Sequence, residues 1–371
     1  MKKLKIHFIV GARPNFMKIA PLFQEFLKAK PLFALKLIHT GQHYGSLMSD
    51  TFFHDLDLPQ PDAFLEVGSS SHACQTAKIM EKYELLLLLD PPDLVIVCGD
   101  VNSTLACALV AAKLNIKIAH LEAGLRSYDR TMPEEINRLL TDQLADLLFV
   151  PSPDASENLL REGIPPQKIF FVGNIMIDSL LQHQVRANQT KILSELKLEK
   201  QKYALITLHR PSNVDSEENL KTLFAVFAAL SLNLKLVFPV HPRTNKNIEQ
   251  FKLMDSLTPN KQLILLPPLG YLDCLQLQMN AKFILTDSGG LQEESTFFGI
   301  PCLTLRENTE RPITITLGTN QLVKLERQDI ENHVQIILRG DYKKGSIPPL
   351  WDGKTAARIL KIVSEKYAHL S

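Results

Sequence analysis

The sequence predicts an α/β protein with two Rossmann-like, doubly wound domains that face each other across a cleft. First, short runs of Val, Ile, Leu and Phe alternate with longer segments of helical period. Second, these apolar runs are nearly continuous, which is typical of parallel strands covered on both faces. Third, a chain of 371 residues is long enough for about two or three domains with cores of their own.

The apolar runs of the first domain are short and bounded by polar or glycine residues, as buried strands are. We expect its strands at Lys5–Val10, Leu35–Thr40, Leu94–Cys98, Ile116–His120, Leu147–Val150 and Phe170–Val172. Between them, helical periodicity predicts helices. These include Met17–Lys28, Cys74–Leu88, Thr104–Leu114 and Glu134–Leu144.

A second strand–helix series begins at Tyr203. Its expected elements are strands at Tyr203–Leu208, Leu236–Val240, Leu263–Leu266, Phe283–Thr286 and Cys302–Leu305, and helices that include Asn219–Ala229 and Leu291–Phe298. Residues 163–166 are rich in turn formers, and 182–202 is a polar stretch that suits a linking helix. We therefore expect domains at 1–170 and 171–354, with a last helix at 355–370 that packs back on the first domain.

Composition and charge exclude several classes of protein. Lys and Arg number 41 against 40 Asp and Glu, a formal net charge of +1, so no global basic field favours a nucleic acid or an anionic membrane as partner. No apolar run approaches the roughly 18–20 residues of a membrane helix. The N-terminal apolar run suits a buried first strand better than a signal peptide. Five cysteines without a Cys-x-x-Cys pair then predict reduced thiols in a cytoplasmic protein.

Polar clusters follow the expected strands repeatedly. They are Gly11–Asn15, Thr40–His43, Gly99–Ser103, His120–Arg126, His209–Asn213, His241–Arg243 and Asp287–Gly290. Open α/β sheets bind their ligands beyond the carboxyl ends of the strands. The clusters therefore predict a shared cleft between the two sheets.

The segment Asp287–Glu294 opens a helix directly after a strand. Glycines allow close backbone approach, and free N–H groups at a helix start bind anions, so this segment suits a phosphate cradle. The alternative is a plain helix start capped by Ser288. Arg306, Arg311 and Lys18 supply positive charge for a diphosphate.

Several residues at the strand ends are candidates for proton transfer, because a cleft with several carboxylates separates their pKa values. The candidates are Asp100, Glu122, Glu134, Glu135 and His209. Taken singly, Asp100 also suits a helix cap, and Glu134 and Glu135 suit the first turn of a helix after Pro133. His120 is expected to be a packed histidine at a strand end.

Motifs for a nicotinamide or a metal are missing from the sequence. No Gly-x-Gly-x-x-Gly follows a strand, and the second strand ends in Thr40-Gly41-Gln42 rather than in an acid that would hold a ribose. No histidine or cysteine cluster has metal-ligand spacing. We expect no cofactor and no metal site.

Taken together, the motifs resemble those of the non-hydrolysing UDP-N-acetylglucosamine 2-epimerases, in the family's order and over almost the whole chain. They are GARPNFMK at 11–18, TGQH at 40–43, GD at 99–100, HLEAGLR at 120–126, PEEINR at 133–138, HR at 209–210, DSGGLQEE at 287–294, TERP at 309–312 and DGKTAARI at 352–359. The resemblance implies the GT-B fold of glycosyltransferases, with UDP on the C-terminal domain, usually in a homodimer.

The resemblance also implies an activity. The family interconverts UDP-N-acetylglucosamine and UDP-N-acetylmannosamine in the cytoplasm, for cell-envelope polysaccharide precursors. UDP is eliminated to leave 2-acetamidoglucal and is then added back after protonation on the other face. By resemblance the catalytic set is Lys18, Asp100, Glu122, Glu134, Arg138 and His209. Contacts to the UDP-sugar are implied for Arg13, Gln42, His43, His241, Tyr271, Ser288, Gly289, Gly290, Glu294 and Arg311.

The chain departs from the family pattern in places. Many bacterial members have Glu where this chain has Asn15, His-Arg-Arg-Glu-Asn where it has 209–213, and an aromatic residue where it has Cys274. These differences leave open whether the substrate UDP-N-acetylglucosamine activates the enzyme allosterically. They also leave room for a 2,3-diacetamido uronic acid sugar nucleotide as substrate. The functions of a hydrolysing epimerase, a GT-B glycosyltransferase and a non-catalytic sugar-binding protein also stay open.

Overall fold

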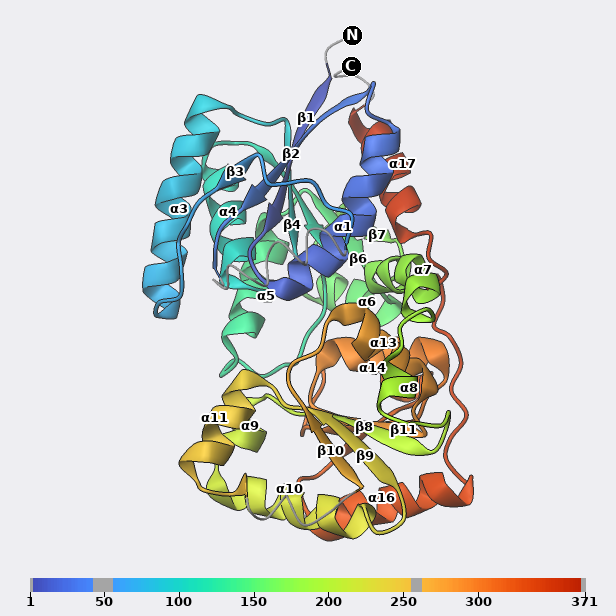
Figure 1. Ribbon diagram of the computed structural model, residues 1–371. Helices are drawn as coiled ribbons and strands as arrows, with labels where there is room; N and C mark the ends of the chain where they lie inside the picture. Colours follow the sequence, from blue (N-terminus) through green and yellow to red (C-terminus); the bar gives the residue numbers. More distant parts are fainter. Residues whose placement is uncertain (1–2, 43–55, 255–261, 368–371) are drawn as a thin grey trace. The chain divides into compact units, whose positions relative to one another are not determined.

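The computed structural model describes residues 3–42, 56–254 and 262–367 (Figure 1). The chain forms two compact units. The first comprises Met1–Ser179 and Pro349–Ser371, and the second comprises Leu180–Pro348. Each unit contains one parallel sheet covered by helices, so the prediction of an α/β protein with two parallel sheets is confirmed.

The sheet of the first unit has, in the described residues, the strand order β3-β2-β1-β4-β5-β6-β7, with neighbours parallel. The strands are β1 (Leu4–Val10), β2 (Phe33–His39), β3 (Ala63–Phe64), β4 (Leu94–Cys98), β5 (Lys117–Leu121), β6 (Leu147–Val150) and β7 (Ile169–Phe171). The direction of winding reverses between β1 and β4. In open α/β sheets, this is the point at which ligands bind beyond the strands' carboxyl ends.

Helices cover both faces of this sheet. Phe8 of β1 packs against Phe23 and Phe26 of α1 (Arg13–Lys28), whereas its neighbour Ile9 belongs to the core on the other face. That second core is covered by α3 (His72–Leu89), α4 (Asn102–Lys113), α5 (Pro133–Leu144) and α6 (Pro153–Arg161). Figure 1 shows α17 (Thr355–Tyr367) beside α1.

The last helix is fixed to the first unit through its N-terminus. The Asp178 carboxylate in α7 (Ile175–Ala187) accepts hydrogen bonds from the N–H groups of Thr355 and Ala356 at 3.2 and 2.9 Å. The indole of Trp351 donates to the Pro151 carbonyl at 3.0 Å. These contacts join residues that lie far apart in the sequence within one core.

The second unit repeats the topology of the first. Its described sheet has the order β10-β9-β8-β11-β12-β13, so the winding reverses between β8 and β11. The strands are β8 (Tyr203–Thr207), β9 (Lys235–Pro239), β10 (Leu263–Leu266), β11 (Phe283–Thr286), β12 (Cys302–Leu305) and β13 (Asn320–Val323). The remaining helices are α8 (Ile192–Glu195), α9 (Pro211–Val214), α10 (Glu217–Leu230), α11 (Pro242–Gln250), α13 (Tyr271–Asn280), α14 (Gly289–Phe298), α15 (Ile313–Thr316) and α16 (Arg327–Arg339).

Two strands were absent from the prediction. β3 has only two residues and pairs with the end of β2, which is too short for a sequence pattern. β13 begins with amide side chains, and Asn320 donates to Gln292 Oε1 at 3.0 Å and to Thr314 Oγ1 at 3.1 Å. Buried hydrogen bonds therefore replace the apolar contacts that would have marked this strand. In the described ranges no helix has the length and apolar character needed to cross a bilayer.

Candidate active site

The loops after β1 and β4 meet at the switch point of the first sheet. A Cβ on Gly11 would lie 2.6 Å from Thr40 Oγ1 and 2.8 Å from Ser103 Cβ, so only glycine fits here. Asn15, in the first turn of α1, donates to the Cys98 carbonyl at 3.0 Å. The N-terminus of α1 is thereby tied to the end of β4.

A buried ion pair lies beside this junction. Lys18 of α1 pairs through Nζ with the carboxylate of Glu122, which follows β5, and the two residues are only 7% and 6% exposed. A Cβ on Gly99 would come within 3.4 Å of both charged atoms. Glu122 has φ 70°, a conformation that non-glycine residues rarely adopt and that is concentrated at functional sites. Placing the Glu122 carboxylate here therefore requires a backbone conformation of unfavourable free energy.

A second ion pair joins Asp100, which follows β4, to Arg138 of α5. Arg138 is also held by Glu135, whose Oε2 lies 2.9 Å from Nε and 2.7 Å from Nη2. Burial opposes ionisation of Glu135, but the N–H groups of Ser127 and Tyr128 and the charge of Arg138 hold its pKa below the usual value. Glu135 thus fixes the guanidinium, and Asp100 presents a carboxylate that is 30% exposed.

Gln42 and Glu134 lie at the same end of the first sheet. Gln42 Oε1 accepts hydrogen bonds from the N–H and the hydroxyl of Ser103 at 3.0 and 2.7 Å, and its carbonyl accepts from Gln75 at 3.0 Å. These bonds join the loop after β2 to α3 and α4. Glu134 is half-buried in the first turn of α5, where the helix dipole favours a carboxylate.

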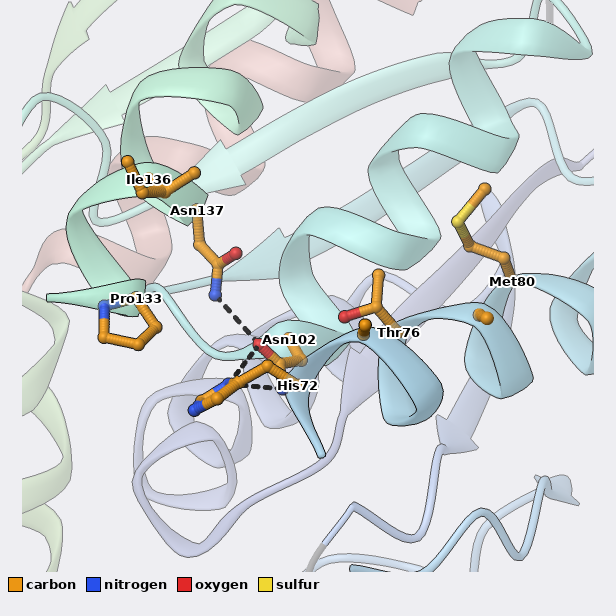
Figure 2. Close-up of a pocket in the computed structure, with 9 residues that line it drawn as sticks. His72, Thr76, Met80, Asn102, Pro133, Ile136 and Asn137 are labelled. Atoms are coloured by element: carbon orange, nitrogen blue, oxygen red, sulfur yellow. Dashed lines mark hydrogen bonds between the residues drawn. The ribbon is translucent and has the colours of Figure 1, made fainter. Parts of the chain in front are cut away.

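A pocket of about 420 Å³ lies between the N-terminal halves of α3, α4 and α5 (Figure 2). Its lining is His72, Ala73, Thr76, Ala77, Met80, Asn102, Pro133, Ile136 and Asn137. Asn137 donates to the Asp100 carbonyl at 2.8 Å and to Asn102 Oδ1 at 3.3 Å. The wall of the pocket therefore holds the backbone of one predicted catalytic residue.

The switch point of the second sheet is organised by Asp287, which follows β11. Its carboxylate is fully buried and accepts hydrogen bonds from the N–H groups of His209 and Arg210 and from the Asn213 amide. It also lies 2.9 Å from His209 Nδ1. Burial opposes ionisation, but the interaction with His209 and these N–H groups hold the pKa of Asp287 below its usual value. Asp287 therefore fixes the orientation of the half-exposed imidazole.

The N-terminus of α14 follows Asp287. Ser288 is the N-cap residue, but its side chain makes no capping hydrogen bond, contrary to the alternative of a plain capped helix. A Cβ on Gly289 would lie 2.7 Å from Arg311 Nη1, whereas a Cβ on Gly290 would meet no described atom within 4 Å. Arg311 is itself paired with Glu293 and Glu310. The helix start thus has N–H groups that suit an anion and a guanidinium packed beneath.

Other predicted residues lie on the same edge of the second sheet. The Tyr271 hydroxyl, at the start of α13, donates to Glu294 Oε1 at 3.2 Å, and both residues are buried. His241 is the N-cap of α11, and its Nδ1 accepts from the Arg243 N–H at 3.2 Å. Its ring centroid lies 5.3 Å from that of His209. Two imidazoles therefore face the same region of this unit.

The predicted site residues cluster at the carboxyl ends of the strands in both units. The first unit contributes Lys18, Gln42, Asp100, Glu122, Glu134 and Arg138. The second contributes His209, His241, Tyr271, Ser288, Gly289, Gly290, Glu294 and Arg311. His43 and the side chain of Arg13 lie outside the described residues. The roles given to these residues, and the cleft, stay predictions.

Sequence reasoning missed how the site is supported. Asp287 was expected in a phosphate cradle and not as the partner of His209, and Glu135 was not expected to hold Arg138. The expectation that His120 is a packed histidine is confirmed, because it is fully buried. Its contact with Asp142 of α5 carried no sequence signal.

Two parallel α/β units with polar groups at their switch points define a two-domain protein of the GT-B type. The lipopolysaccharide outer core galactosyltransferase WaaB, in its apo form, shares the fold with a TM-score of 0.56 over 98% of this chain and 100% of that chain. The two sequences are 17% identical, so this likeness concerns the fold alone.

A family model described as UDP-N-acetylglucosamine 2-epimerase matches residues 25–364, and the chain belongs to this family. The UDP-N-acetylglucosamine 2-epimerase of Methanocaldococcus jannaschii is 43% identical over 97% of this chain and 99% of its own. Its crystal structure in complex with UDP-GlcNAc and UDP has a TM-score of 0.90, covering 98% of this chain and 100% of that chain at 42% identity. The UDP-2,3-diacetamido-2,3-dideoxy-D-glucuronate 2-epimerase of Pseudomonas aeruginosa is 40% identical over 88% of this chain and 90% of its own.

Proposed function

We propose that this protein interconverts UDP-N-acetylglucosamine and UDP-N-acetylmannosamine by eliminating UDP and adding it back to 2-acetamidoglucal. The observation that carries the proposal is the pair of ion pairs at one sheet edge, Lys18 with Glu122 and Asp100 with Arg138, in a chain of this family. Such pairs hold carboxylates in a fixed orientation, as proton transfer requires.

The chemistry explains why a diphosphate-holding surface is needed. The C-2 hydrogen of an acetamido sugar is not next to a carbonyl and is poorly acidic. Cleavage of the bond between C-1 and the phosphate oxygen must therefore lead, which gives C-1 oxocarbenium character and acidifies C-2. Stabilising the negative charge on the departing UDP is then the main electrostatic task. The sugar gains no net electrons over the cycle, so we propose a reaction without nicotinamide. We also propose that charged side chains, rather than a metal, stabilise the departing UDP.

We propose that the second unit holds UDP. The uncapped N-terminus of α14, with Ser288, Gly289 and Gly290, suits the diphosphate. Glu294 would hold the ribose, and its partner Tyr271 would contact the uracil. Arg311 supports Gly289 from below, and His209 with His241 would donate to the leaving phosphate.

We propose that the first unit transfers the C-2 proton. Asp100, Glu122 and Glu134 are its candidate acids and bases, one for each face of C-2 with a third to orient the sugar. Lys18 forms an ion pair with Glu122, and Arg138 forms one with Asp100, so these two carboxylates are oriented. Gln42 and His43 would contact the substrate beside them. In the elimination half-reaction one carboxylate takes the C-2 proton as the C-1–O bond breaks. In the addition half-reaction a protonated carboxyl group gives a proton to the opposite face of C-2 as UDP re-forms the C-1–O bond.

We also propose that the protein works as a homodimer in the cytoplasm, for cell-envelope polysaccharide precursors. The dimer is supported by Leu85, Leu88 and Leu89 of α3, which are 63%, 65% and 85% exposed. A reducing compartment is supported by the five cysteines, which are free thiols.

The test is incubation with UDP-N-acetylglucosamine in heavy water, without NAD or acceptor, followed by NMR of the products. Deuterium at C-2 of a nucleotide-linked sugar is expected, with both epimers present at equilibrium. Free N-acetylmannosamine and UDP would instead indicate a hydrolysing enzyme. If only UDP-2,3-diacetamido-2,3-dideoxy-D-glucuronate is turned over, the substrate is the one named for the Pseudomonas relative. No C-2 exchange in either sugar would overturn the proposal.

A further inference from the structure

A buried charge cluster lies behind the catalytic carboxylates of the first unit. Its members are His120 at the end of β5, Asp142 of α5, Arg126 and Glu162. His120 Nδ1 lies 2.6 Å from Asp142 Oδ1, and Asp142 Oδ2 lies 2.7 Å from Arg126 Nη2. Arg126 also donates to both Glu162 oxygens, at 2.8 and 2.6 Å. His120 and Asp142 are fully buried, so neither can touch a substrate.

The partners of the His120 ring fix its orientation. Its Nδ1 faces a carboxylate and its Nε2 lies 2.8 Å from the Gly99 carbonyl oxygen. Both partners are hydrogen-bond acceptors, so each ring nitrogen is placed to donate a hydrogen bond.

The Gly99 peptide is the element that His120 controls. The Gly99 N–H donates to the Leu121 carbonyl at 3.0 Å, and the Gly99 carbonyl, which belongs to the following Gly99–Asp100 peptide group, accepts from His120. Because a peptide is planar, fixing the carbonyl fixes the plane that leads into Asp100. The same glycine lies against the Lys18–Glu122 pair, where an added Cβ would lie 3.4 Å from both charged atoms.

Helix α5 carries the residues that hold both Asp100 and His120. Arg138 and Asp142 lie four residues apart on one face of this helix, and they hold Asp100 and His120 respectively. Asp142 also accepts from the Gly124 N–H at 3.1 Å, which restrains the loop just after Glu122. One carboxylate thus restrains the segments that carry both Asp100 and Glu122.

We infer that His120 is a positioning residue that, through the Gly99 carbonyl, sets the spacing between Asp100 and Glu122 for the two proton transfers at C-2. This inference rests on the proposed epimerase function. Elimination breaks C-1–O and C-2–H, gives UDP its electron pair and gives the proton to one carboxylate. Return requires a second carboxyl group, in its protonated form, to give its proton to C-2 on the opposite face while UDP attacks C-1. A displaced Gly99–Asp100 turn would slow this return and let 2-acetamidoglucal and UDP escape.

Two substitutions separate the two hydrogen bonds of the ring. His120→Gln keeps an amide nitrogen near the position of Nε2, so it retains the bond to Gly99. His120→Asn keeps one near Nδ1, so it retains the bond to Asp142 and loses Gly99. His7→Asn is the matched control, because His7 is another fully buried histidine of this sheet, in β1.

The measurement is the ratio of released 2-acetamidoglucal to epimerised UDP-sugar, followed by NMR early in the reaction. This ratio does not depend on the fraction of folded protein, so loss of stability alone leaves it unchanged. We expect His120→Asn to raise the ratio at least threefold and to lower kcat about 10- to 100-fold, since small misplacement in an active site has effects of this size. His120→Gln is expected to stay within about threefold of wild type in kcat, and His7→Asn to leave the ratio unchanged.

Should His120→Asn fail to fold, Asp142→Asn is the second variant. It replaces the carboxylate that holds the His120 ring and the Gly124 N–H, so the same rise in the ratio is expected. An unchanged ratio in folded His120→Asn or Asp142→Asn, beside an active wild type, would overturn the positioning role. An equal rise in His7→Asn would overturn it as well. A wild type without C-2 exchange would instead count against the proposed function.

Discussion

The two units share one topology but organise their switch points differently. In the first, buried ion pairs hold carboxylates, as Lys18 holds Glu122 and Arg138 holds Asp100. In the second, a buried carboxylate, Asp287, holds an imidazole and two backbone N–H groups, beside an uncapped helix start. The first arrangement suits proton transfer and the second suits anion binding. The same fold can therefore supply two chemistries through the residues at its strand ends.

The largest effect is expected from Asp100→Asn in the first unit. Removing a carboxylate that transfers a proton should lower kcat about 10²- to 10³-fold with little change in KM. The measurement is the initial rate of epimerisation. Asp146→Asn is the matched control, because Asp146 is also 30% exposed and paired, but with Lys117 at the other end of the sheet. If Asp146→Asn lowered kcat as much as Asp100→Asn, loss of a negative charge, rather than the position of Asp100, would explain the effect.

A smaller loss is expected from Asp287→Asn in the second unit. An amide cannot accept from all the donors that meet this carboxylate, so His209 loses its fixed orientation. We expect kcat/KM to fall about 10- to 100-fold and UDP binding to weaken. The control is Asp215→Asn, an exposed aspartate of the same unit paired with Arg243. If Asp287→Asn kept its UDP affinity, the assignment of anion binding to this unit would be wrong.

Acid should weaken the first unit through its buried histidines. Burial lowers the pKa of His7 and of His39 to about 4 in each case, below the unfolded value of about 6.5. The unfolded chain therefore binds protons first, so stability is complete above pH 6.5 and is lost as the pH falls towards 4. At pH 5, each histidine should lower the free energy of unfolding by about 2 kcal/mol relative to its value above pH 6.5.

Trp351 is the sole tryptophan and lies in the first unit, so its fluorescence during urea unfolding at pH 7 and pH 5 measures this loss. In His7→Phe the difference between the two pH values should shrink by about half. An undiminished difference would show that other groups cause the acid sensitivity.

The smallest effects are expected at the start of α14. Gly289→Ala would push its Cβ against Arg311 and should destabilise the protein by about 1–3 kcal/mol. Gly290→Ala has room and should stabilise the helix by up to about 1 kcal/mol, while its Cβ would hinder a bound diphosphate. Thermal unfolding with and without UDP checks both. Stabilisation of Gly290→Ala by UDP as strong as that of wild type would argue against an anion at this helix start.

The sequence was informative about strands because buried parallel strands are continuous apolar runs, and polar residues at their ends marked the switch points. The sequence could not predict which side chains hold the site residues in place. Asp287 is 78 residues from His209 in the chain, and they meet only because β8 and β11 are neighbours. Likewise, Asp142 reaches His120 because α5 packs beside β5. β13 was missed because its buried amides are satisfied by distant side chains.

The division of roles between the units is tested most directly by the dissociation constant of UDP, measured by titration calorimetry on wild type, Asp100→Asn and Asp287→Asn. We expect Asp100→Asn to bind UDP within about twofold of wild type and Asp287→Asn to bind it about tenfold more weakly. The contrary result, a loss of UDP affinity in Asp100→Asn as large as that in Asp287→Asn, would contradict the assignment of proton transfer to one unit and nucleotide binding to the other.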